Sequence, residues 1–263
     1  MKLCDLLDEL RNGILHDVTN QVAGSINTDQ LWSDERLVRY INEAQRRFAR
    51  LGLILRDGTT PSCTQFKTTA VDDNEGNWST ELDPSVIAVL SCRMIGDTAD
   101  LARAGHSAFD TYREPDTYFF DPSSLSTIPP GKPVAYDTDE TLSLSDDGQL
   151  SVVTLRLYPA PSTPYVGVTG QLRVIRMPLE HLTIKNLNAE PEIPTSLHID
   201  MLDWAAYLAL RKVDIDASMP ERAQEFRQSF EAHVEEAKRE MQKKLFTPMQ
   251  WSFGRNGFSW ENG

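Results

Sequence analysis

The sequence has little of what marks a membrane, secreted or metal-binding protein. No apolar run approaches the ~20 residues that a bilayer-spanning helix requires. The first residues carry acids within their apolar spacing, so they do not form a signal peptide. The three cysteines are odd in number and contain no CxxC pair, which predicts neither a disulfide framework nor a zinc site. We therefore expect a cytosolic chain with reduced thiols and no membrane partner.

Catalytic signatures are also missing from the sequence. It contains no GxGxxG, no HExxH and no complete phosphate-binding loop. The five histidines are scattered, and none is paired with an acid at a metal-ligand spacing. These absences predict a protein that is not an enzyme and that has no cofactor and no metal site.

The charge balance argues against a protein that reads DNA sequence. The 39 acidic and 26 basic residues give a net charge of −13. A field of that sign repels the phosphate backbone. The same repulsion prevents DNA from sticking, so an acidic wall suits a conduit through which double-stranded DNA passes without specific binding.

What the sequence does contain is helical periodicity near its two ends and strand-like patterning between them. Apolar residues recur at spacings of three and four over 3–20, 33–51 and 199–246. Helices at the two ends must meet to bury their apolar stripes, so the middle becomes an insertion. The prediction is an α+β chain with a discontinuous helical bundle, an inserted antiparallel β-rich domain and an extended C-terminal arm. Its expected parts are 1–58 (N-terminal helices), 59–190 (β-rich insertion), 191–246 (C-terminal helices) and 247–263 (docking arm).

The helix expected over 33–51 has clear start signals and an unusual charge. Ser33 is a good N-cap, and Trp32 and Leu37 are placed to form a hydrophobic staple. Its apolar stripe runs to Leu51. The helix also carries a local excess of positive charge that fits either a solvated face or a surface for an acidic partner or a neighbouring subunit. The arginines are Arg36, Arg39, Arg46, Arg47 and Arg50.

The middle of the chain predicts mostly strands. They are expected at 66–71, 78–82, 86–95, 134–136, 141–144, 150–158 and 170–177, with one helix at 101–112. Because short turns separate several of these strands, an antiparallel meander is the natural arrangement.

The last residues form a second candidate interaction site. Their aromatic side chains fit no helical or strand period, and proline and glycine interrupt the segment. Aromatic side chains in an extended arm favour docking into a partner. The residues concerned are Phe246, Trp251, Phe253, Phe258 and Trp260.

Five segments together resemble one known family. They are LWSDERLVRYINEAQRRFAR (31–50), GKPVAYDTDE (131–140), LRLYPAP (155–161), LRVIRMP (172–178) and EIPTSLHIDMLDWAAYLALRKVDID (192–216). The sequence resembles the head–tail adaptor, or connector, proteins of tailed bacteriophages over most of its length before the tail.

The resemblance implies a virion structural protein at the head–tail interface. It implies a self-associated ring, expected to hold twelve copies, between the portal protein and a tail tube or nozzle protein, with DNA passing through. It also implies that a terminal segment, here 247–263, reaches into the portal.

Three alternatives stay open at the level of sequence. One is another tail component: a tail-tube, nozzle or tail-completion protein. A second is a metal-dependent hydrolase that uses Asp72, Asp137 and Asp139. The third is a carbohydrate-binding module whose stacking platform would consist of Trp78, Tyr118 and Tyr136.

Overall fold

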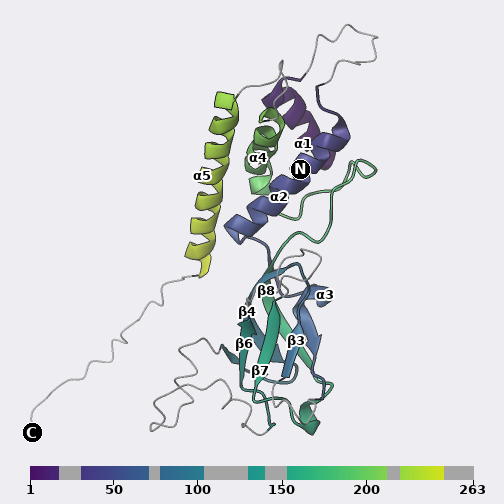
Figure 1. The fold of residues 1–263 in the computed structure, drawn as a ribbon, viewed down its shortest axis with the longest axis vertical. Helices are drawn as coiled ribbons and strands as arrows, with labels where there is room; N and C mark the ends of the chain where they lie inside the picture. Colours follow the sequence, from purple (N-terminus) through teal and green to yellow (C-terminus); the bar gives the residue numbers. More distant parts are fainter. Residues whose placement is uncertain (18–30, 71–77, 104–129, 140–152, 212–219, 246–263) are drawn as a thin grey trace, which may run out of the picture.

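The computed structural model describes residues 1–17, 31–70, 78–103, 130–139, 153–211 and 220–245 (Figure 1). Helices gather at one end of its long axis and strands at the other, which confirms the predicted α+β class. The helices are α1 (Leu3–Asp8), the π-helical η1 (Glu9–Leu15), α2 (Asp34–Gly52), α3 (Pro61–Thr64), α4 (His198–Leu210) and α5 (Pro220–Leu245), with short 3₁₀ turns at Thr163–Tyr165 and Thr195–Leu197. The strands are β1 (Arg56–Asp57), β2 (Gln65–Lys67), β3 (Trp78–Glu81), β4 (Val86–Met94), β5 (Ala102–Arg103), β6 (Ala135–Asp139), β7 (Thr154–Tyr158) and β8 (Thr169–Arg176).

The first helical segment is shorter than its periodicity predicts. It was expected to reach about residue 20, but η1 ends at Leu15. His16 then takes a left-handed conformation with φ 53°, which reverses the chain and stops the helix.

Helix α2 begins and ends where its local signals place it. The Ser33 Oγ accepts a hydrogen bond from the Arg36 backbone N–H at 3.4 Å. Trp32 and Leu37 are both buried. Leu53 adopts a left-handed φ of 52° just after Gly52. One detail differs: Leu51, expected in the apolar stripe, is 37% exposed.

Helix α4 lies in the middle of the helical part. It packs on α2 on one side and on α5 on the other, as its nearly all-apolar sequence predicts. Helix α5 runs along the outside of this group (Figure 1). Phe230 of α5 is fully buried, with its ring centroid 5.5 Å from Phe48 of α2 and 5.1 Å from Trp204 of α4. These aromatic contacts join the N-terminal and C-terminal helices.

The strands form two sheets rather than a simple meander, which corrects that expectation. In the first sheet β8 is central, with β4 on one edge and both β1 and β2 on the other, all antiparallel. The second sheet has the order β3-β7-β6-β5. The prediction of a helix at 101–112 is also wrong at its start. Residues Ala102–Arg103 form β5 instead, which pairs in parallel with β6. The strand expected at 141–144 lies outside the described residues.

The buried apolar side chains form two separate clusters. One draws on residues between Leu3 and Leu55 and between Leu182 and Ala237. The other draws on both sheets, between Cys63 and Val174. Segments from the two ends of the chain thus share one core, while the strands between them share another.

A buried ion-pair cluster lies where the two parts meet. The Arg176 Nε donates to Asp57 Oδ2 at 2.7 Å, and Nη1 donates to Glu192 Oε2 at 2.5 Å. Burial raises the pKa of the Asp57 carboxyl, but hydrogen bonds from Thr60, Thr59 and Arg176 outweigh burial and hold that pKa well below its usual value. The cluster therefore fixes β1, the end of β8 and the segment that leads back into α4.

Candidate functional site

Four of the five predicted arginines form one exposed surface on α2. They recur at helical spacing on the side opposite the buried stripe, and none forms an ion pair with another described residue. We call this surface the arginine face; it consists of Arg36, Arg39, Arg46 and Arg50. In a chain with a net charge of −13, four unpaired guanidinium groups on one helix make a local positive surface.

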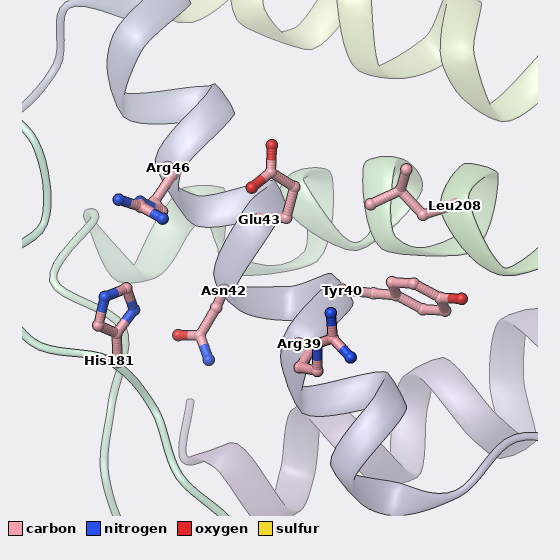
Figure 2. A pocket seen from close by; sticks show the side chains of 7 residues that line it. All are labelled: Arg39, Tyr40, Asn42, Glu43, Arg46, His181 and Leu208. Atoms are coloured by element: carbon pink, nitrogen blue, oxygen red, sulfur yellow. The ribbon is translucent and has the colours of Figure 1, made fainter. Parts of the chain in front are cut away.

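Helix α2 also borders a groove of about 530 Å³ (Figure 2). Arg39 and Arg46 belong to both the groove and the arginine face. The remaining lining residues are Tyr40, Asn42, Glu43, His181 and Leu208, which come from α2, the segment after β8, and α4. The groove thus combines two cations and one carboxylate, that of Glu43, with aromatic and aliphatic side chains.

A reciprocal amide contact holds the wall of the groove in place. Asn42 Nδ2 donates to the Leu182 carbonyl at 2.8 Å, and the Leu182 N–H donates to Asn42 Oδ1 at 2.9 Å. This pair fixes the segment that carries His181 against α2. Sequence reasoning missed the groove, because Asn42 and Leu182 are 140 residues apart and no local pattern links them.

Arg47 differs from the other four arginines. Its guanidinium carbon lies 3.9 Å from the centre of the Trp204 ring, within the range of a cation–π contact, and its side chain is half-buried. Trp204 in turn contacts Phe230. Arg47 therefore has a partner within its own chain, between α2 and α4.

The second predicted site, in the C-terminal arm, lies outside the described residues. This applies to Phe246, Trp251, Phe253, Phe258 and Trp260, and to the whole of 247–263. Their docking role stays a prediction.

The residues of the two non-phage alternatives do not assemble into sites within the described part of the chain. There, no group of three metal-ligating side chains comes together. Asp72 and Tyr118 lie outside the described residues, while Asp137 and Asp139 both lie on β6. The stacking platform is wrong, because Trp78 and Tyr136 are 3% and 2% exposed and belong to the sheet core. In the same described segments, no helix is long and apolar enough to cross a membrane.

A charged, exposed helix face beside an open groove is the kind of surface through which one protein binds another. The family described as SU10 adaptor protein matches residues 5–251, so the chain belongs to that family of phage head–tail adaptors. This confirms the resemblance drawn from the five segments. None of the curated proteins compared with the chain matches it. Membership implies a structural, non-enzymatic role in the virion and contact with portal and tail proteins.

Proposed function

We propose that this phage adaptor forms a ring that joins the portal to the tail and leaves a passage for DNA. The single observation that carries the proposal is the family match over residues 5–251. The ring holds twelve copies in this proposal, one beneath each subunit of a twelve-fold portal. A tail-tube or nozzle protein attaches to its other side, and the protein is made in the host cytoplasm before it joins the virion.

The division of the chain supports this role. The cluster drawn from residues between Leu3 and Leu55 and between Leu182 and Ala237 gives a helical body, while residues between Cys63 and Val174 supply the second core. The Arg176 cluster fixes the two connections between these parts. A rigid body of this kind can hold partners at a set distance, with 247–263 proposed as the arm that enters the portal.

The charge of the chain supports passage of DNA rather than its capture. A net charge of −13 disfavours stable contact with phosphates, so a channel built from these chains allows the duplex to move. The binding interactions then fall to protein surfaces, including the arginine face.

Cryo-electron microscopy of the assembled virion tests the proposal. We expect the two-part shape of this chain directly below the portal, repeated around the tail axis. Density that places the chain in the tail tube or at the tail tip would support another tail component instead.

A further inference from the structure

The arginine face has a counterpart of opposite charge on the same chain. The solvent side of α5 carries exposed glutamates that recur at helical spacing. We call them the glutamate face: Glu221, Glu225, Glu235 and Glu236. The exposed Arg227 of the same stretch is already paired with Glu231 at 2.9 Å. Two exposed cations, Arg239 and Lys243, lie along the same side of α5, so its four carboxylates outnumber the cations and the glutamate face presents net negative charge.

Within that face, most carboxylates lack a partner. Among the described ion pairs, the one that involves this face joins Glu235 to Lys238 at 3.9 Å, and the exposed Arg239 lies one helical turn from both Glu235 and Glu236. That distance is at the limit of an ion pair and leaves the carboxylate open to a better partner.

The two faces have matching lengths. Arg36 and Arg50, the ends of the arginine face, are 14 residues apart, and Glu221 and Glu236, the ends of the glutamate face, are 15 residues apart. At 1.5 Å per residue these separations are about 21 and 22 Å. Two helices of this kind can lie side by side with charges of opposite sign at most positions, the exceptions being Glu43 on α2 and Arg239 and Lys243 on α5.

The two faces do not meet within one chain. Both α2 and α5 turn their apolar stripes toward the shared core and their charged faces toward solvent. The described ion pairs contain no contact between an arginine of α2 and a glutamate of α5. Any such pairing therefore joins different copies.

We infer that the arginine face of one copy binds the glutamate face of the next copy. This inference rests on the proposed ring and names the contact that builds it. A contact between two different surfaces is heterologous, and it closes into a ring when the rotation between copies allows. The groove beside Arg39 and Arg46 receives the glutamate side chains.

Charge also explains why a local pairing is needed. Copies that each carry −13 repel one another at long range, so association requires opposite charges at the contact itself. Exposed ion pairs are individually weak and are screened within roughly 8 Å at physiological salt. Association through this contact should therefore weaken as salt is raised.

A pair of complementary charge reversals tests the contact in the full chain. One variant carries Arg39→Glu with Arg46→Glu, and the other carries Glu225→Lys with Glu236→Lys. Each variant alone places like charges at the two reversed positions of every contact and should stay monomeric. In an equal mixture, every contact between unlike variants restores opposite charges, so rings that alternate the two should form. Native mass spectrometry, with and without the portal ring, should show assemblies that contain equal numbers of the two variants. The total number of copies in each assembly should therefore be even.

The control is a double charge reversal on the sheet, Arg93→Glu with Arg173→Glu. Both positions are exposed, and the net charge changes by the same amount as in the variant with Arg39→Glu and Arg46→Glu. It should assemble as the wild type does, and all variants should keep the wild-type unfolding midpoint. A mixture that stays monomeric, or reversed variants that assemble alone, would overturn the contact. If each variant alone is still captured by the portal in many copies, the α2–α5 contact is wrong and the adaptor function stands. If the wild type neither self-associates nor binds the portal, the proposed function fails as well.

Discussion

At the scale of single residues, a few close contacts determine how the described parts hold together. Gly170 of β8 lies under the Phe66 ring of β2, where a Cβ atom would meet the ring at 2.1 Å. Arg176 is surrounded by two carboxylates, from Asp57 and Glu192. Neither role is visible in the local sequence. Gly170 contacts a ring about 100 residues away, and Arg176 meets carboxylates from two separate segments of the chain.

We expect Gly170→Ala to destabilise the sheet part. The added methyl group has to displace the Phe66 ring, and overpacking of this kind costs about 1–3 kcal/mol. Chemical denaturation measures the free energy of unfolding. Gly58→Ala is the matched control, because its new Cβ would lie 3.5 Å from an Arg173 side-chain carbon, an ordinary contact. An unchanged stability for Gly170→Ala would mean that the ring moves aside freely.

We expect Arg176→Met to destabilise the protein by about 3–5 kcal/mol near neutral pH, because two partly buried carboxylates lose their cation. The folded-state pKa of Asp57 lies below its unfolded value, so its contribution is complete above the unfolded pKa and is lost as pH falls through the folded pKa. The difference between variant and wild type should therefore shrink in acid.

Unfolding at a series of pH values measures this trend. Arg173→Met, an exposed arginine on the same strand, should change stability little at any pH. A difference for Arg176→Met that grows in acid would contradict the assigned role of the Asp57 carboxylate.

At the scale of elements, local signals predicted the helices well and the strand pairing poorly. Ser33 capping and the all-apolar α4 are properties of short segments, so sequence alone located α2 and α4. The pairing of β8 with β1, β2 and β4 joins residues that are 76 to 119 positions apart in the sequence, which turn chemistry does not encode. The parallel pairing of β5 replaced an expected helix for the same reason.

The candidate site divides in the same way. The sequence placed five arginines on this helix, and the structure shows four of them, Arg36, Arg39, Arg46 and Arg50, on one exposed face. To predict that Arg47 turns inward, the position of Trp204 had to be known. To predict the groove, the position of the segment around His181 had to be known. Both come from the other end of the chain.

We expect Phe230→Ala to cost about 3–5 kcal/mol of stability, because a fully buried ring between α2 and α4 would be lost. Phe226→Ala, which removes a half-buried ring from the same helix, should cost less. Equal, near-zero effects would mean that α5 is not held against the bundle in the isolated chain.

At the scale of the whole molecule, the chain keeps the surfaces that we propose for binding apart from its folding core. The arginine face and the glutamate face lie on the solvent sides of α2 and α5, while the shared core holds those helices through their apolar stripes. Exposed charges can therefore be changed without loss of the fold, and assembly can be altered separately from stability.

We expect removal of 247–263 to leave the unfolding transition unchanged and to weaken binding to the portal, because the arm adds aromatic contacts to a partner in our proposal. Pull-down on the portal ring, with the unfolding midpoint measured on the same sample, separates the two effects. Loss of cooperative unfolding on truncation would show that the arm belongs to the fold.

The most direct measurement is the native mass of the full chain mixed with the portal ring. The proposed function predicts a single complex in which many copies, twelve for a twelve-fold portal, are bound per portal. A chain that remains a free monomer beside an unoccupied portal would contradict the account.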